Sequence, residues 1–190
     1  MAGIRIECHP LTPDRWGDFV RLFGENGACG GCWCMWWRQT RAEFDKKHGA
    51  ANRRAMKRIV ESGQVPGVLG YEGEKVIGWA SVAPREQFAS LERSPVLRRI
   101  DETSVWSLVC LFVDRSERGR GVAESLVRCA CDYAFSEGAP AVESYPVEPR
   151  GRRLAAASSF MGTPELFIRA GFKECGRPSK SRRVMRKYAD

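Results

Sequence analysis

Residues 105–135 read VWSLVCLFVDRSERGRGVAESLVRCACDYAF, and this stretch decides the fold. Val105 to Val113 is almost continuously apolar, which is typical of a central strand that is covered on both faces. From Val122 onward, apolar residues recur at helical spacing until Gly138, a natural C-terminal stop. The stretch therefore predicts a buried strand, a short polar loop and an amphipathic helix.

The loop between this strand and helix has the composition of a phosphate-binding site. It consists of Arg118, Gly119, Arg120, Gly121, Val122 and Ala123. The first N–H groups of a helix have no intrahelical partner and the helix dipole is positive there, so an anion is stabilised. The glycines allow close approach of the backbone and the arginines add positive charge. The simpler alternative is a solvated loop that caps a core helix.

Other phosphate-binding loops match this segment poorly. It lacks the Gly-Lys-Ser/Thr ending of a P-loop, and Glu124 occupies the position of the third glycine in a dinucleotide fingerprint. These differences argue against a nucleoside triphosphatase and against a dehydrogenase.

The flanking sequence predicts an α/β protein with a mixed central sheet flanked by helices. Upstream we expect a strand over 4–8, a helix from Thr12 to Phe23, a basic helix over 41–62, a hairpin of strands over 67–71 and 75–82, and an irregular segment over 85–104. Downstream we expect a strand over 141–145, an Arg/Gly-containing loop, a helix over 164–170, and strands over 172–175 and 184–188. A length of 190 residues fits one domain.

Charge and cysteine content restrict the partners and the compartment. The formal net charge of +8 implies an anionic partner, either nucleic acid or a phosphorylated cofactor. No apolar run approaches the roughly 20 residues that cross a bilayer, and the N-terminus lacks a signal-peptide pattern, so we expect a cytoplasmic protein without a membrane partner. Among the eight cysteines, Cys110, Cys129 and Cys131 lie inside apolar or helical patterns, which predicts reduced thiols.

Two motifs in the chain resemble the GNAT superfamily of acetyl-CoA-dependent N-acetyltransferases. The family's pyrophosphate signature, Gln/Arg-x-x-Gly-x-Gly/Ala after an apolar strand, is matched by Arg118, Gly121 and Ala123. A second family element, a short helix that runs into Gly-Phe and a strand, is matched by Leu166–Phe172. With the upstream hairpin, the resemblance covers about residues 65–175.

The resemblance implies a single GNAT-like domain over 1–190. Residues 1–64 would form acceptor-side helices and a Cys/Trp segment, 65–175 the acetyl-CoA-binding core, and 176–190 a closing strand. The central strand and the next one would splay apart, so that the pantetheine arm of acetyl-CoA pairs with the backbone of Leu111, Phe112 and Val113. A neutral primary amine would attack the thioester directly in a ternary complex, helped by proximity and by backbone N–H groups at the oxyanion.

The chain departs from the family at both usual proton carriers. Many members have a glutamate base eleven residues before the signature arginine, where this chain has Ser107, and a tyrosine acid four residues before the glycine of Gly-Phe, where it has Phe167. Tyr145 and Glu102 are the candidate catalytic substitutes by location. The alternatives are a packed aromatic residue for Tyr145 and a surface carboxylate for Glu102.

The segment Cys29-x-x-Cys32-x-Cys34, with His48 downstream, has part of a zinc-site pattern. Because the second Cys-x-x-Cys knuckle is missing, we expect no metal. The neighbouring residues Trp33, Met35, Trp36 and Trp37 fit either a hydrophobic core or a wall of the acceptor pocket.

The C-terminal run 177–187 is strongly basic. It fits a charged edge hairpin better than a nucleic-acid contact. The sequence thus predicts an N-acetyltransferase, with a basic nucleic-acid or ribosome-associated module without catalysis as the alternative, and a zinc-stabilised interaction protein as the third. The acceptor amine and a homodimer are left open.

Overall fold

A seven-stranded mixed sheet forms the centre of the computed structural model, which describes residues 4–148 and 160–190. The strands are β1 Glu7–Pro10, β2 Val68–Glu72, β3 Lys75–Pro84, β4 Trp106–Val113, β5 Ala141–Ser144, β6 Lys173–Ser179 and β7 Arg182–Tyr188. Their order across the sheet is β1-β2-β3-β4-β5-β7-β6. Only β4 and β5 pair in parallel, and β4 is central, as its apolar sequence predicts.

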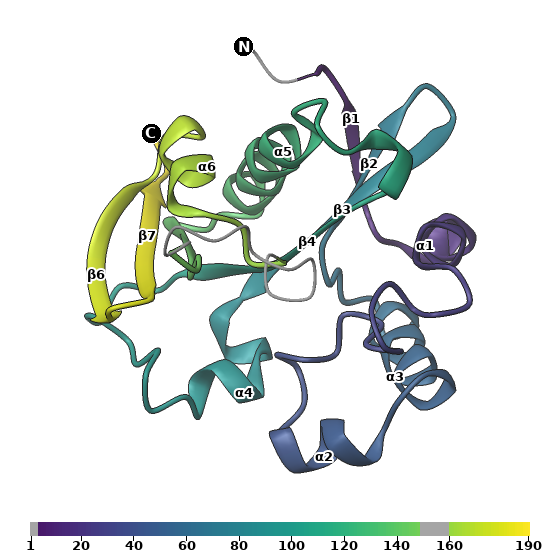
Figure 1. The fold of residues 1–190 in the computed structure, drawn as a ribbon, viewed down its shortest axis with the longest axis horizontal. Helices are drawn as coiled ribbons and strands as arrows, with labels where there is room; N and C mark the ends of the chain where they lie inside the picture. Colours follow the sequence, from purple (N-terminus) through teal and green to yellow (C-terminus); the bar gives the residue numbers. More distant parts are fainter. Residues whose placement is uncertain (1–3, 149–159) are drawn as a thin grey trace.

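Helices cover both faces of the sheet (Figure 1). They are α1 Trp16–Phe23, α2 Arg41–Lys46, α3 Ala50–Glu61, α4 Ala89–Glu92, α5 Val122–Ser136 and α6 Pro164–Arg169. Helices α5 and α6 lie on one face, and α1 and α3 lie on the other. The α/β class with a mixed sheet is therefore confirmed.

Two glycines allow α5 to lie close to the sheet. Gly70 on β2 and Gly78 on β3 are register partners beneath Leu126 of α5. A Cβ atom at Gly70 would come within 2.8 Å of the Leu126 side chain, and one at Gly78 within 2.6 Å. Real Cβ atoms essentially never approach so closely, so these glycines set the distance between helix and sheet.

Several predicted boundaries are wrong. The helix expected over 41–62 is two helices, because the chain leaves the helical conformation after Lys46 and Gly49 has a left-handed φ of +55°. The first strand is Glu7–Pro10 rather than 4–8. The division of the domain at 175/176 stays a prediction, and it would fall inside β6. The Arg/Gly loop expected after Tyr145 falls on 149–159, outside the described residues.

The expectation of reduced thiols is wrong for two cysteines. Cys8 on β1 and Cys129 on α5 form a disulfide, with Cα atoms 6.0 Å apart. Both residues belong to the apolar layer between α5 and the sheet, and this brings together positions 121 residues apart in sequence. Within the described residues, no helix is both long enough and apolar enough to cross a bilayer.

Candidate functional site

Strands β4 and β5 part halfway along β4. Their pairing covers only Trp106–Leu108 of β4, although this strand continues to Val113. At the point of separation, the Ser144 hydroxyl donates to the Leu108 carbonyl at 2.9 Å. The sheet therefore opens toward the C-terminal end of β4, as the family resemblance implies.

The opening is bridged by a carbonyl group from a distant part of the chain. The N–H of Leu111 donates to the Phe160 carbonyl at 2.7 Å. Leu111 and Val113 contribute to the apolar layer under α5, whereas Phe112 lies on the opposite face and its ring centroid is 5.4 Å from that of Phe23. The backbone at Leu111, which we expected to meet a pantetheine arm, already has a hydrogen-bond partner.

The loop that follows β4 exposes a continuous series of backbone donors. Within the described residues, no N–H group of 118–123 has a backbone acceptor in a turn, loop or helix cap, and none donates to a side chain. Gly119 and Gly121 have φ angles of +82° and +83°, and Gly121 directly precedes α5. N–H groups without a partner at a helix N-terminus are donors of the kind with which proteins commonly bind anions. The phosphate-binding role of the loop 118–123, the cradle, stays a prediction.

The two arginines of this loop differ in their contacts. Arg120 is paired with Glu72 at 2.7 Å and also with Glu117. Arg118 donates through Nε to the Val113 carbonyl at 3.2 Å, and no carboxylate among the described residues lies within ion-pair distance of it. The charge of Arg120 is thus compensated by carboxylates, whereas that of Arg118 is not; the cofactor-binding role expected of both arginines stays a prediction.

Glu117 anchors the loop to the sheet. Its side chain is buried, and its Oε1 lies 2.6 Å from Lys75 Nζ on β3. Hydrogen bonds from Lys75, and then from Arg120, lower the pKa of Glu117 to about 2. The carboxylate thus stays ionised at neutral pH and holds the loop through two cations.

Tyr145, a predicted catalytic residue, lies in a buried polar network just past β5. Its hydroxyl accepts from Arg85 Nη1 at 2.8 Å, donates to Glu143 Oε2 at 3.0 Å, and lies 2.8 Å from Ser107 Oγ. Burial, together with the Glu143 charge, raises the pKa of Tyr145 well above its usual range. The phenol therefore remains protonated, but it is only 1% exposed. Its catalytic role stays a prediction.

The network also contains two fully buried arginines. Arg186 on β7 donates to Glu143 Oε1 from Nε at 2.9 Å and from Nη2 at 2.6 Å. Arg85 donates to Glu92 and to the Leu97 carbonyl. Because the Glu143 carboxylate is held by cations, its charge is compensated inside the sheet. Sequence reasoning missed this network; the signal was a charged residue, Glu143, within a short predicted strand beside the central one.

The structure does not bring Glu102 to the opening. Glu102 is exposed in the loop before β4. The cradle, in contrast, follows the C-terminal end of β4. Eight residues of strand at about 3.3 Å per residue separate the two ends by roughly 25 Å. Phe167 at the usual acid position is fully buried on α6 and packs against Phe172, with ring centroids 5.1 Å apart.

The Cys/Trp segment packs on the α1 side of the sheet. Trp33 is 3% exposed and stacks on Phe23 with ring centroids 5.8 Å apart. Trp36 meets Phe44 of α2 edge to face. In 4–148 and 160–190, no group of three His, Cys, Asp or Glu residues converges as metal ligands would. The aromatic residues of this segment thus form a core layer between the helices and the sheet.

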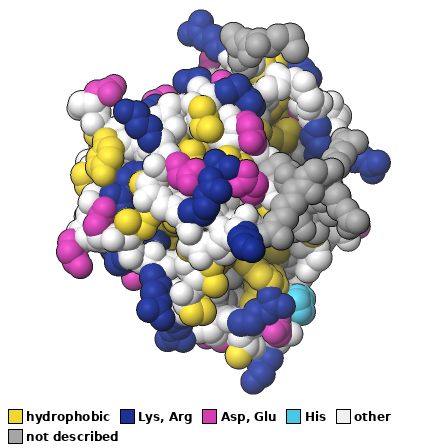
Figure 2. Space-filling view, turned by 60° about the vertical axis from the view of Figure 1, so that its left-hand side comes forward, with side chains coloured by type: hydrophobic (Ala, Val, Ile, Leu, Met, Phe, Trp, Pro, Cys, Tyr) yellow, Lys and Arg dark blue, Asp and Glu magenta, His cyan; other side chains and the backbone are white. Residues whose placement is uncertain are grey.

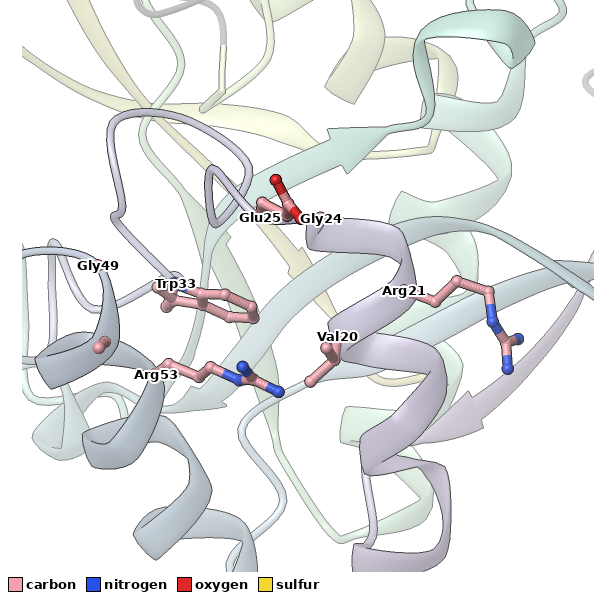
Figure 3. A pocket seen from close by; sticks show the side chains of 8 residues that line it. Val20, Arg21, Gly24, Glu25, Trp33, Gly49 and Arg53 are labelled. Atoms are coloured by element: carbon pink, nitrogen blue, oxygen red, sulfur yellow. The ribbon is translucent and has the colours of Figure 1, made fainter.

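A pocket of about 320 Å³ opens beside this layer, between α1 and α3. Figure 3 shows the Arg53 side chain extending beneath the Trp33 ring toward Val20. The Arg53 guanidinium lies 5.4 Å from the ring centroid, a cation–π contact. The carboxylate of Glu25 lies at the other edge of the pocket. The pocket therefore combines an aromatic wall with both signs of charge.

Among the described residues, basic and acidic side chains alternate on the β6 side of the molecule. Figure 2 turns this side forward, and Lys and Arg are interspersed there with Asp and Glu. On the terminal hairpin, Arg183 contacts Glu148 and Glu174, and Arg177 contacts Glu174. The structure thus agrees with a charged edge hairpin, formed by the edge strand β6 and its neighbour β7.

Comparison with known proteins gives one family. The model described as the acetyltransferase (GNAT) family matches residues 32–156. No curated protein sequence matches the chain.

Solved structures with a similar fold carry related names. A GNAT-family acetyltransferase from Listeria monocytogenes has a TM-score of 0.59 and 12% identity, covering 100% of this chain and 99% of that one. The PaiA N-acetyltransferase of Thermoplasma acidophilum, solved in complex with coenzyme A, has a TM-score of 0.53 and 12% identity, covering 98% and 100%. A protein from Corynebacterium glutamicum, described as histone acetyltransferase HPA2 and related acetyltransferase, has a TM-score of 0.52 and 21% identity, covering 98% of each chain. At these identities the likeness establishes the fold.

Proposed function

Because the chain belongs to the acetyltransferase (GNAT) family, we propose that it moves an acetyl group from acetyl-CoA to a primary amine by direct attack in a ternary complex. The observation that carries the proposal is the series of unpartnered N–H groups over 118–123 at the start of α5. A diphosphate is the anion that such a series suits, because several oxygens can accept at once. A structural neighbour was solved with coenzyme A, which supports this choice of ligand.

The cradle would hold the pyrophosphate with backbone donors and with one free cation. Arg118 is exposed and has no carboxylate partner among the described residues, so it can move onto a phosphate oxygen. Arg120 would act indirectly, since its pairs with Glu72 and Glu117 keep the loop against the sheet.

The thioester would lie in the opening beyond Leu108, where β4 and β5 no longer pair. For the pantetheine arm to pair with Leu111, the Phe160 carbonyl has to give up the Leu111 N–H. The released donor could then stabilise the oxyanion as the amine attacks. Placing both reactants in one opening converts a bimolecular step into a step within a complex, which lowers the barrier substantially.

We place the amine on the side of the sheet that bears α1 and α3. Phe112 faces that side from the end of β4 and packs on Phe23, which belongs to the same aromatic layer as the pocket of Figure 3. The Glu25 carboxylate at this pocket would attract a protonated amine before it loses its proton. Tyr145 remains the proposed proton donor to the departing thiolate, because the positions that usually carry the acid and base hold Phe167 and Ser107.

The test is a panel of amines, assayed for release of free thiol from acetyl-CoA, combined with calorimetry of coenzyme A. We expect micromolar or tighter cofactor binding and thiol release with at least one class of amine. Cofactor binding without turnover on any amine would contradict the transferase assignment. Failure to bind coenzyme A, together with salt-sensitive RNA binding, would favour the nucleic-acid alternative.

A further inference from the structure

Arg53 is the cation of the pocket between α1 and α3 that remains available to a ligand. Its guanidinium lies over the Trp33 ring, and no carboxylate among the described residues lies within ion-pair distance of it. Arg21 is the other arginine of the lining, but its Nη1 is paired with Asp18 at 2.8 Å, and Figure 3 shows its side chain extending away from the pocket. The positive charge of the pocket is therefore that of Arg53.

Glu25 supplies the negative charge of the same pocket. Its side chain is exposed in the turn after α1, and no basic side chain in 4–148 and 160–190 lies within ion-pair distance of it. Arg53 and Glu25 are not paired with each other, and the Trp33 ring lies between them in the view of Figure 3. Two opposite charges thus line one cavity, and neither is neutralised by a described residue.

Hydrogen bonds join the loop after α1 to the start of α3. The Gly49 N–H and the Asn52 side-chain Nδ2 both donate to the Gly31 carbonyl, at 3.1 and 3.0 Å. The Gly31 N–H in turn donates at 2.9 Å to the carbonyl of Asn26, the residue after Glu25. The backbone positions from which the two charged side chains extend are therefore fixed relative to each other.

The Trp33 ring is a rigid apolar wall between these charges. Its residue has a left-handed φ of +43°, a region that residues other than glycine, asparagine and aspartate rarely adopt, so the surrounding packing holds it there. A Cβ atom at Gly27 would come within 2.3 Å of the indole Nε1, which shows that the loop backbone lies directly against the ring. An apolar group of a ligand can pack on such a wall without first ordering it.

We propose that the acceptor of the acetyl group is a small zwitterion with the chemistry of a free amino acid that has an apolar side chain. The inference rests on the function proposed above. The carboxylate of the ligand binds Arg53, its ammonium group approaches Glu25, and its side chain lies on Trp33. A volume of about 320 Å³ lies at the lower end of the range for small-molecule sites, which fits a ligand of this size.

The two charges also select against other amines. A polyamine brings a second cation toward Arg53, and an acid without an amine brings its carboxylate toward Glu25, so each of these ligands meets one repulsive contact. A ligand that carries both charges meets none. The pocket therefore distinguishes acceptors by the presence of a carboxylate as well as an amine.

The transfer changes the charge of the ligand. The ammonium group gives one proton to solvent, and the neutral nitrogen attacks the thioester carbon. The N–C bond forms, the C–S bond breaks, and one of the two protons left on nitrogen ends on the coenzyme A thiol. The N-acetyl product keeps the carboxylate that Arg53 binds but has no cation for Glu25. The product therefore binds more weakly than the substrate, which favours its release.

The first test compares ligands that differ by one charge, in calorimetry of the full-length protein with and without coenzyme A. The probes are the amino acids with apolar side chains, the matching amines without a carboxylate, and spermidine. We expect at least one amino acid to bind about tenfold more tightly than its matching amine, the effect of one charge-assisted interaction. Equal binding of the two, tighter binding of spermidine, or no binding of any amino acid would overturn the proposal.

Two arginines of α3 provide a matched pair of variants. Arg53 and Arg54 are both exposed, and Arg54 is not among the residues that line the pocket. Arg53→Gln should abolish the preference for an amino acid over its matching amine, whereas Arg54→Gln, with the same loss of net charge, should keep it. Glu25→Gln should weaken amino-acid binding about tenfold and leave the matching acid without an amine at least as tightly bound. Equal losses in the two arginine variants would mean that only net charge matters and would contradict the site.

Thiol release from acetyl-CoA separates this proposal from the transferase assignment. Turnover of an amino acid that is lost in Arg53→Gln and kept in Arg54→Gln would support both. Amino-acid binding with the expected dependence on charge, but without thiol release, would contradict the transferase assignment and leave the zwitterion site standing. Thiol release that is equally fast with amines lacking a carboxylate would keep the transferase assignment and overturn the zwitterionic acceptor.

Discussion

Ser107 on β4 and Glu143 on β5 are direct register partners, and the Tyr145 hydroxyl lies between their side chains. Ser107 occupies the position at which many GNAT proteins have a glutamate base. In this chain the carboxylate lies on the neighbouring strand instead, where Arg186 holds it. A buried, charge-compensated network therefore surrounds the position that the family resemblance gives to the base, and the role of that network can be measured.

Tyr145→Phe removes the hydroxyl that links this network. We expect the free energy of unfolding to fall by about 1–3 kcal/mol, because Arg85 loses an acceptor and Glu143 loses a donor in a buried site. Urea denaturation measures this. Tyr71→Phe is the matched control, since the Tyr71 hydroxyl also donates to a carboxylate, that of Asp18, but on β2, three strands away from β5.

Turnover of the same variant tests the proton-donor role. If Tyr145 donates to the leaving thiolate, kcat should fall about 10²-fold with little change in acetyl-CoA affinity, at a temperature where the variant is fully folded. An unchanged kcat would restrict Tyr145 to structure.

Glycines at the two ends of α5 provide a matched pair of variants with which to test the cradle. Gly121 precedes the helix with φ of +83°, and Gly138 follows it with φ of +84°. Alanine at either position should cost about 1–2 kcal/mol of backbone strain. Only Gly121→Ala adds a methyl group beside the unpartnered N–H groups, so it alone should weaken coenzyme A binding in calorimetry. Equal affinities in the two variants would mean that the cradle is misassigned.

Substitutions of the two loop arginines should have separate effects, one on coenzyme A binding and the other on stability. Arg118→Gln should weaken coenzyme A binding by about tenfold and leave the melting temperature unchanged, because its guanidinium has no carboxylate partner among the described residues. Arg120→Gln should lower the melting temperature more than Arg118→Gln does, because it breaks contacts with Glu72 and Glu117. If Arg120→Gln weakened coenzyme A binding and Arg118→Gln lowered the melting temperature, Arg120 would be the phosphate ligand instead.

Acid should loosen the same loop. Lys75 and Arg120 lower the pKa of Glu117 to about 2, against about 4.3 in an unfolded chain. For a depressed carboxyl pKa, the stabilisation is complete above the unfolded value and is lost as the pH falls through the folded value. The melting temperature of wild type should therefore exceed that of Glu117→Gln at pH 6, and the difference should vanish as the pH approaches 2. A constant difference across this range would contradict the ion pairs.

Local patterns in the sequence predicted the strand, loop and helix around 105–135 and the hairpin of β2 and β3. Each is specified by the period of its own apolar residues, so β4 begins within one residue of the predicted start. The break between α2 and α3 was missed because the residues around Gly49 keep a helical pattern of charge. The extended backbone of Lys47 and the left-handed backbone of Gly49 separate the two helices.

The features that sequence reasoning missed at the site are contacts between distant positions. Arg120 and Glu72 are separated by 48 residues. Leu111 lies on β4, whereas its partner Phe160 lies shortly before α6. Neither contact can be recognised from the sequence, because a charged residue or a backbone carbonyl is written the same way whether it faces solvent or a partner. The position of the loop between a strand and a helix could be predicted, whereas the carboxylate partners of Arg120 could not.

The disulfide between Cys8 and Cys129 provides the last prediction, and it corrects our expectation of reduced thiols. It ties β1, an edge strand that pairs only with β2, to the centre of α5, and it closes a loop of 121 residues. Cross-links of this kind typically stabilise by about 2–4 kcal/mol, chiefly through the unfolded chain. For a chain of this length, reduction or Cys8→Ser should lower the melting temperature by roughly 5–15 °C. Cys175→Ser, at an exposed position on β6, is the control and should leave the melting temperature unchanged. Thiol titration in denaturant without reductant checks the chemistry independently. Six reactive thiols would agree with the disulfide, since six cysteines are free beside it. Eight thiols, with a melting temperature indifferent to reductant, would restore the reduced state that the sequence predicts and would fit a reducing compartment.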